Sequence, residues 1–195
     1  MMMPLVVILA GGEGSRMGGG KPLRMLGGET LIARARRRAE GWSDGVRIAL
    51  RDPAQAGPFG ADALLDDPDV WGPLAGLKSA LAAARSESRA RVLTLPCDMP
   101  FLPADLLERL SGTIGDKGAA LASSDGQLHP VCGLWSVRVL DLMPAYLGGG
   151  RRSLKGLAEQ AGFVAVEWPE ASFINLNTPE ELASAERRVA SEIEH

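Results

Sequence analysis

Short, nearly continuous apolar runs alternate along the chain with segments whose apolar positions recur at helical spacing. Such runs are typical of strands buried on both faces of a sheet, and strands that alternate with helices form a mainly parallel sheet. The pattern therefore predicts an α/β fold. The expected strands span residues 5–9, 46–50, 91–95, 119–122, 130–135 and 164–168, and the expected helices span 30–40, 74–85, 103–110, 137–146, 154–160 and 179–191.

A glycine-rich segment follows the first expected strand and reads LAGGEGSRMGGGK over residues 9–21. Its six glycines allow the backbone to expose N–H groups and to approach an anion closely. Arg16 and Lys21 add positive charge to the same segment. We therefore expect this loop to bind a nucleotide through its phosphates.

Two better-known phosphate loops do not fit this segment. A Walker A loop that ends at Lys21 requires glycine at Ser15 and serine or threonine at Pro22. A dinucleotide-binding fingerprint that starts at Gly12 meets Met17 where its third glycine lets helix and strand pack. The loop therefore belongs to another class of nucleotide site.

Four further motifs follow the loop: GPLAG at residues 72–76, PCDMPFLP at 96–103, HPV at 129–131 and NLNTPEEL at 175–182. In this order, they resemble the signature of the molybdenum cofactor guanylyltransferases, the MobA-like branch of the nucleotidyltransferases. The family loop runs LAGG, three variable residues, RMGG, a variable residue and DK. Here Gly20 replaces the usual aspartate, and the segment between Arg16 and Lys21 is one residue shorter.

The resemblance spans nearly the whole chain and implies a three-layer Rossmann-like nucleotidyltransferase fold in a single domain over residues 1–195. It implies transfer of GMP from GTP to the phosphate of molybdopterin or Mo-molybdopterin, with release of pyrophosphate. The LAGG and NTPEEL motifs favour this guanylyl branch. The alternatives are a CTP-dependent molybdopterin cytidylyltransferase, another nucleotidyltransferase, and a nucleotide- or pterin-binding module without catalysis.

Asp98 is the candidate metal ligand. Ligands of parallel sheets bind outside the carboxyl ends of the strands, and both the glycine loop and Asp98 follow expected strands. A carboxylate there suits Mg²⁺, which prefers carboxylate and phosphate oxygens. The resemblance assigns Lys21 to the nucleotide phosphates and Arg16 to the triphosphate. We therefore expect Arg16, Lys21 and Asp98 to be the catalytic residues and Mg²⁺ to be the cofactor.

Asp66 and Asp67 follow a short apolar run, where the family has an acidic residue that recognises the base or the sugar. A carboxylate is a suitable acceptor for the N–H groups of guanine, although both residues also fit a solvated turn. The family's asparagine after the second strand is replaced near Ala49. The expected nucleotide-binding residues are Leu9, Ala10, Gly11, Gly12, Lys21, Asp66, Asp67, Gly76 and Asp98.

Further along the chain, the resemblance places His129, Asn175 and Asn177 toward the pterin phosphate. His129 also fits a structural hydrogen bond in a turn, and the two asparagines also fit local backbone hydrogen bonds ahead of the final helix. Arg151 and Arg152 can pair with an acceptor phosphate, although basic pairs at a helix start are usually solvated. The final helix has a start signal, because Thr178, Pro179 and Glu181 form a capping box with proline in the first turn.

The composition of the chain limits the classes of binding partner that we expect. A net charge of −3 and few aromatic residues argue against nucleic-acid binding, which needs a basic surface. No run is long enough to span a membrane, and the first residues do not resemble a signal peptide, so we expect a cytoplasmic protein. Cys97 and Cys132 are interpreted as packing residues. The expected partners are GTP, the pterin and, transiently, molybdoenzymes or their chaperones.

Overall fold

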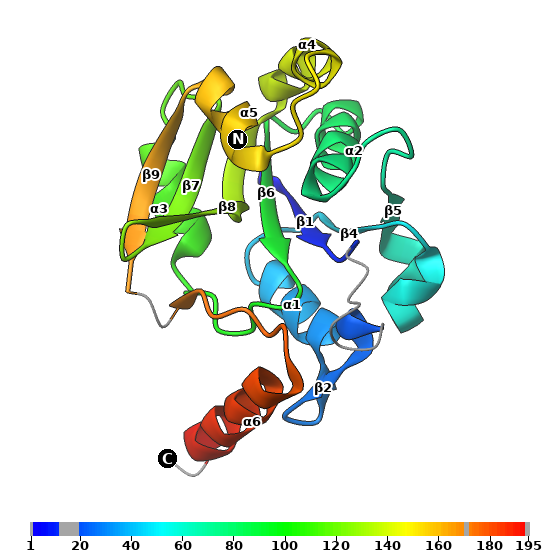
Figure 1. Cartoon of the computed structure of the whole chain (residues 1–195), viewed down its shortest axis with the longest axis vertical. Coiled ribbons are helices and arrows are strands. Elements are labelled where there is room, and N and C mark those ends of the chain that lie inside the picture. Colours follow the sequence, from blue (N-terminus) through cyan, green and yellow to red (C-terminus); the bar gives the residue numbers. More distant parts are fainter. Residues whose placement is uncertain (1, 12–19, 170–171, 194–195) are drawn as a thin grey trace.

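Seven strands form the central sheet in the computed structural model, which describes residues 2–11, 20–169 and 172–193 (Figure 1). Their order across the sheet is β5-β4-β1-β6-β8-β7-β9. The strands are β1 (Leu5–Leu9), β4 (Val46–Leu50), β5 (Ala63–Leu65), β6 (Arg91–Pro96), β7 (Ala119–Ser124), β8 (Gln127–Ser136) and β9 (Phe163–Trp168).

The sheet is mainly parallel, as the sequence predicts. β1 pairs in parallel with β4 and β6, β4 with β5, and β7 with β9. β8 is the exception, because it runs antiparallel to both β6 and β7. A tight turn at Asp125 and Gly126 joins β7 to β8, and both residues have positive φ angles, as a two-residue hairpin turn requires. The expected strand at 130–135 is therefore the second half of a longer hairpin strand.

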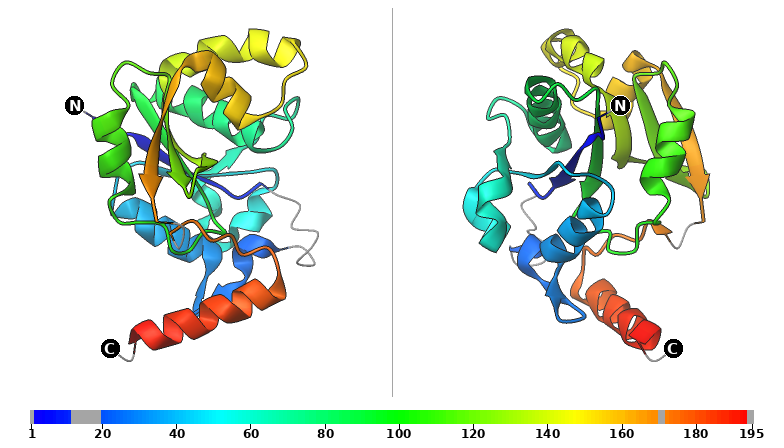
Figure 2. Two further views of the ribbon diagram at one scale, coloured as in Figure 1. Left: turned by 60° about the vertical axis from the view of Figure 1, so that its left-hand side comes forward. Right: turned by 180° about the vertical axis from the view of Figure 1, so that it is seen from behind.

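Helices cover both faces of the sheet, which gives three layers (Figures 1 and 2). Side chains of β1 alternate: Val6 and Ile8 join the core with α1 (Leu31–Glu40) and α3 (Leu106–Thr113). Leu5 and Val7 join the opposite core. That second core contains residues of α2 (Pro73–Ser86), α4 (Met143–Gly148) and α5 (Leu154–Ala161). Burial on both faces explains why the strand at residues 5–9 is apolar throughout.

Three 3₁₀ segments complete this part of the described chain: η2 (Lys21–Leu23), η3 (Pro53–Asp62) and η4 (Val137–Leu142). The single helix expected over residues 137–146 is therefore divided, because η4 precedes α4 and Pro144 lies in the first turn of α4. The helix expected from residue 103 begins later, at Leu106. The first difference lies at the opposite end of the sheet from the site, because η4 follows Ser136, which pairs with Arg91 at the start of β6.

The last helix, α6 (Pro179–Ile193), packs against a small ribbon of β2 (Met25–Leu26) and β3 (Glu29–Thr30) beyond the carboxyl ends of the strands (Figure 2). Leu26 and Leu176 share a buried cluster with apolar residues of α6, and Glu186 accepts a hydrogen bond from the Gly27 backbone at 3.0 Å. These contacts hold the segment before α6 next to the end of β6. Within the described ranges, we find no helix with the length and apolar character that crossing a bilayer requires.

Candidate active site

The carboxyl ends of β1 and β6 form the base of the candidate site. The two strands are parallel neighbours, and Leu9 at the end of β1 lies beside Pro96 at the end of β6. The glycine loop starts at the first of these ends, and Asp98 follows the second. The prediction that these two strands lie side by side is therefore confirmed, in the arrangement where parallel sheets bind ligands.

Lys21 connects three distant segments of the chain. Its Nζ donates hydrogen bonds to Asp98 Oδ2 at 2.5 Å and to Asn177 Oδ1 at 2.8 Å. The side chains of Lys21 and Asp98 are 14% and 19% exposed, so most of their surface is shielded from water. Gly20, which replaces the family's aspartate, has a φ of 63°, a left-handed conformation that glycine adopts without strain.

The segment before α6 is fixed at both of its ends. The Leu176 backbone N–H donates to the Asp98 carbonyl at 2.9 Å. The predicted capping box is confirmed, because the Glu181 N–H donates to Thr178 Oγ1 at 3.2 Å and Glu181 Oε2 accepts from the Thr178 N–H at 2.9 Å. The same carboxylate accepts from the Asn177 N–H at 2.6 Å. The position of the Asn177 side chain beside Lys21 therefore follows from a rigid helix start.

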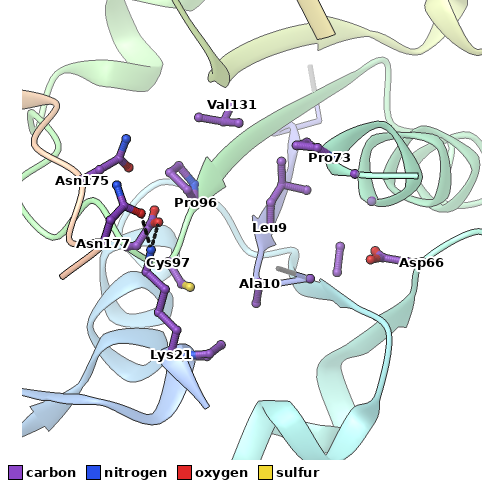
Figure 3. Close-up of a pocket in the computed structure, with 16 residues that line it drawn as sticks. Leu9, Ala10, Lys21, Asp66, Pro73, Pro96, Cys97, Val131, Asn175 and Asn177 are labelled. Carbon is purple, nitrogen blue, oxygen red and sulfur yellow. Dashed lines mark hydrogen bonds and ion pairs between the residues drawn. The ribbon is translucent and has the colours of Figure 1, made fainter. Parts of the chain in front are cut away.

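These groups line one end of a cavity of about 540 Å³. Figure 3 shows Lys21, Asn177 and Asn175 on one side of the cavity and Asp66 on the other, with Leu9 and Ala10 between them. The volume suits a small-molecule ligand. The lining residues are Leu9, Ala10, Gly11, Lys21, Pro22, Ala49, Asp66, Gly72, Pro73, Gly76, Pro96, Cys97, Asp98, Val131, Asn175 and Asn177.

The Asp66 carboxylate occupies a space left open by the absence of side chains at Gly11 and Gly76, two of the predicted nucleotide-binding residues. A Cβ atom added to Gly11 would lie 2.3 Å from Asp66 Oδ2, and one added to Gly76 would lie 3.2 Å from Asp66 Oδ1. Asp66 Oδ1 is buried and has no hydrogen-bond partner among the described residues. Burial raises the pKa of Asp66 to about 6, and the positive charge of Arg51 opposes this shift. The result is a buried acceptor at the cavity wall that no described residue satisfies.

Asp67 is placed differently from its neighbour. Its carboxylate forms an ion pair with Lys78 at 2.7 Å and also accepts the Asp69 backbone N–H at 3.0 Å. These contacts, with the Lys78 hydrogen bond as the largest cause, lower the pKa of Asp67. Of the two acidic candidates, only Asp66 lines the cavity. The geometry thus favours Asp66 as the nucleotide contact, which stays a prediction.

Three other candidates lie outside the residues that line the cavity. His129 stacks on Phe173 with ring centroids 4.7 Å apart, and burial is the main cause of its lowered pKa. Arg151 donates to Gln160 at 3.0 Å, and Arg152 donates to the Leu147 carbonyl at 2.9 Å. The contacts of these three side chains are structural, whereas Asn175 and Asn177 do line the cavity.

Both cysteines are buried and free, as the packing interpretation expects. Burial raises the pKa of Cys97 to about 12 and also raises the pKa of Cys132, which disfavours the reactive thiolate. Sequence reasoning included Val131 in the HPV motif but did not predict it as a lining residue, although the motif was a usable signal. Two predicted residues, Gly12 and Arg16, lie outside the described residues.

The donor groups fit the magnesium ion that the resemblance implies. Mg²⁺ is usually held by one or two carboxylates together with substrate phosphates and water. Asp98 supplies one such carboxylate at the cavity wall. Within residues 2–11, 20–169 and 172–193 there is no group of three or more His, Cys, Asp or Glu side chains able to hold a metal. The site therefore suits a metal that arrives with phosphate ligands more than one in an all-protein cage.

Comparison with known proteins gives consistent matches. A family model described as a MobA-like NTP transferase domain matches residues 6–162. The chain is 38% identical over 183 residues to the molybdenum cofactor guanylyltransferase of Cereibacter sphaeroides strain ATCC 17029, covering 92% of this chain and 94% of the relative. It is 41% identical over 192 residues to the molybdenum cofactor guanylyltransferase of Rhodopseudomonas palustris strain BisB5, covering 93% and 91%.

Solved structures support the same fold. Molybdopterin-guanine dinucleotide biosynthesis protein A of Archaeoglobus fulgidus aligns with a TM-score of 0.77 at 23% identity, covering 95% of this chain and 98% of that one. The 4-diphosphocytidyl-2C-methyl-D-erythritol synthase of Anaerococcus prevotii aligns with a TM-score of 0.78 at 13% identity, covering 97% and 96%. These likenesses show a shared architecture. The family model over residues 6–162 and the relatives at 38% and 41% identity establish that the chain belongs to the MobA-like NTP transferase family.

Proposed function

We propose that this protein transfers GMP from GTP to the terminal phosphate of molybdopterin or Mo-molybdopterin and releases pyrophosphate. The observation that carries the proposal is the two-ended cavity. Lys21, Asp98 and Asn177 converge at one end, and Asp66 presents a free acceptor at the other. The first end suits phosphates and the second suits a nucleoside, and the relatives named above are molybdenum cofactor guanylyltransferases.

The reaction needs placement and charge neutralisation more than acid–base chemistry. The acceptor phosphate is already anionic at neutral pH, so its oxygen can attack the α-phosphorus of GTP without a general base. A new P–O bond forms as the bond between the α-phosphorus and the bridging oxygen breaks, and the negative charge leaves on pyrophosphate. Lys21 stabilises that charge, because its ammonium group faces the cavity between a carboxylate and an amide oxygen.

Asp98 is the residue that would hold Mg²⁺, which supplies charge neutralisation on the phosphates when it is bound. In the ligand-free arrangement Asp98 accepts a hydrogen bond from Lys21. A triphosphate would compete with Asp98 for that ammonium group and thereby release the carboxylate. We assign Arg16 to the triphosphate because the resemblance of the glycine-rich loop implies that role. We place the reaction in the cytoplasm. We expect the product to pass to molybdoenzymes or their chaperones through transient contacts.

Pyrophosphate release by the purified protein is the direct test. The protein is incubated with molybdopterin or Mo-molybdopterin, Mg²⁺ and each of GTP, CTP, ATP and UTP, with reactions lacking the pterin as controls. Pterin-dependent release with GTP supports the proposal. Release with CTP alone would instead assign a cytidylyltransferase, an outcome to which Ala49 at the cavity wall gives weight, because the family has asparagine near this position. Tight GTP binding without pyrophosphate release would assign a non-catalytic module.

A further inference from the structure

Arg51 and Trp71 form a contact beside the nucleoside end of the cavity, outside the residues that line it, and the proposed reaction has not used this contact. Arg51 directly follows β4, and Trp71 directly precedes Gly72 and Pro73, which line the cavity at the start of α2. The Arg51 guanidinium carbon lies 5.2 Å from the centre of the Trp71 ring. Trp71 is 66% exposed, although a large aromatic side chain is usually buried. We therefore ask what function an exposed tryptophan in contact with an arginine serves beside the cavity.

The strand register brings Arg51 level with Asp66. β4 and β5 are parallel, Leu50 lies beside Leu65, and the Asp66 N–H donates to the Leu50 carbonyl at 3.0 Å. The residues that follow this pair are Arg51 and Asp66. The charge of Arg51 reaches the Asp66 carboxyl, since it opposes the effect of burial on the pKa of that group.

The polar groups of this pair are left without protein partners in the described part of the chain. The structure there gives Arg51 no hydrogen bond and no ion pair within 4.0 Å, and its one ring contact is with Trp71. Asp66 Oδ1 likewise has no hydrogen-bond partner in this part of the chain. By contrast, the nearby cation Lys78 is neutralised by Asp67 at 2.7 Å. A set of donors and an acceptor therefore stand beside each other, and no described protein group is bonded to them.

Guanine is the base whose edge matches such a pair. Its O6 acceptor lies next to the N1–H and N2–H₂ donors, so a carboxylate can take the two donors while a guanidinium group donates to O6 or N7. Adenine and cytosine present an amino donor in place of O6, which would oppose a guanidinium group. Uracil offers a single N–H between two acceptors.

We propose that Arg51 is a guanine-selecting residue that donates to the acceptor edge of the base, and that Trp71 positions it through their cation–π contact. This inference rests on the proposed function, because it takes GTP as the nucleotide in the cavity. It adds a second, cationic determinant beside Asp66 and explains how the chain can select guanine with Ala49 in place of the family's asparagine.

The test compares nucleotide affinities of four variants by calorimetric titration of GTP, CTP, ATP and UTP in the presence of Mg²⁺. For Arg51→Gln we expect GTP affinity to fall by about 30-fold and CTP affinity to change by less than about threefold, since one bidentate base contact is worth roughly 10- to 100-fold. Trp71→Ala should lower GTP affinity by about fivefold, and Trp71→Phe should restore most of it. Arg47→Gln is the matched control, because Arg47 lies on β4, the strand that Arg51 follows, but pairs with Glu87, and it should leave all four affinities unchanged.

Steady-state kinetics add a second readout. Arg51→Gln should raise the KM for GTP and leave kcat almost unchanged, because the contact is the same in the ground state and the transition state. An unchanged preference for GTP over CTP in Arg51→Gln would overturn the inference, and so would an equal loss of affinity for all four nucleotides. A wild-type protein that prefers GTP but releases no pyrophosphate with the pterin would overturn the proposed transfer alone, while the Arg51 comparison would still support or refute base selection.

Discussion

The two ends of the cavity satisfy their polar groups in opposite ways. At the phosphate end, Lys21 bonds both Asp98 and Asn177, and the segment that carries Asn177 is fixed by a capping box. At the nucleoside end, Asp66 keeps a buried oxygen without a partner in the described structure. The first end is satisfied before any ligand arrives, whereas the second is incomplete without one.

The difference matters because a buried carboxylate without a partner destabilises the fold much more than a paired one. The Lys21–Asp98 pair can therefore stay ordered in the absence of substrate, and the incoming phosphates exchange partners with it. Asp66 instead keeps its acceptor free at the expense of stability, which shows in its raised pKa. The phosphate end should thus control the rate of the reaction, and the nucleoside end should control affinity and choice of nucleotide.

Asp98→Ala should have the largest effect, at the end that we expect to control the rate. Removing the proposed metal ligand should lower kcat for pterin-dependent pyrophosphate release by about 1,000-fold or more. The fold should survive, because the Leu176 N–H donates to the backbone carbonyl of residue 98, and the substitution does not change that carbonyl. Circular dichroism and the Tm verify folding. Asp67→Ala serves as the matched control, and full turnover by a folded Asp98→Ala protein would refute the assigned role.

Lys21→Ala should lower kcat by about 100-fold, in the range found when one group that stabilises transition-state charge is removed. Lys21→Arg should not restore the rate, because the planar guanidinium group cannot occupy the position of an ammonium that lies 2.5 Å from Asp98 and 2.8 Å from Asn177. Single-turnover kinetics at saturating GTP measure this effect. If the arginine variant reached the wild-type rate, a simple positive charge would suffice and the geometric argument would fail.

Asp66→Asn should weaken GTP binding by about 30-fold and leave kcat at saturating GTP within about threefold of wild type. For the wild type, affinity should be constant above pH 7 and fall as the pH drops through about 6, because protonation removes the acceptor for the base N–H groups. The asparagine variant should lack this pH dependence. Titrations between pH 5 and 8 measure both effects, and an identical pH profile in the variant would refute the assignment.

The same substitution should stabilise the ligand-free protein. Asp66 titrates at about 6 in the folded state and near its ordinary value of 3.8 when unfolded, so the folded state is penalised above pH 6 and the penalty disappears below about pH 4. Because the group is only half-buried, we expect Asp66→Asn to raise the free energy of unfolding at pH 8 by about 1 kcal/mol. Urea denaturation at pH 8 and pH 4 measures the gain, which should be absent at the lower pH.

The sequence predicted that β1 and β6 lie side by side because local signals at their carboxyl ends agree. Hydrophobic runs identified β1 and β6, and both candidate motifs follow their carboxyl ends, so Lys21 and Asp98 could be expected to meet. The antiparallel course of β8 was missed, although Asp125-Gly126 is a strong hairpin signal. The apolar run that follows the turn is equally compatible with a parallel strand, and this obscured the hairpin.

The nucleoside end was less predictable because its distinctions depend on side-chain direction. Asp66 and Asp67 are adjacent in the sequence and chemically identical, yet one packs against Gly11 at the cavity wall and the other pairs with Lys78. A solvated turn gives no periodicity from which to choose between them. Arg51 was overlooked for a related reason, since a single exposed arginine after a strand carries no signal until the fold places it beside Asp66.

Asn177→Ala should give the smallest effect of the three substitutions at the phosphate end and is the sharpest test of whether that end is held rigid in advance. The substitution removes one of the two acceptors that orient Lys21 but leaves the Asp98 contact and the capping box, whose bonds involve the Asn177 backbone and not its side chain. We expect kcat to fall by about tenfold and the KM for GTP to change by less than about twofold. Asn177→Asp, which keeps an acceptor oxygen at the same position, should recover most of the rate. A tenfold rise in KM with unchanged kcat would instead place Asn177 among the residues that bind the ground state, and the division of labour between the two ends of the cavity would not hold.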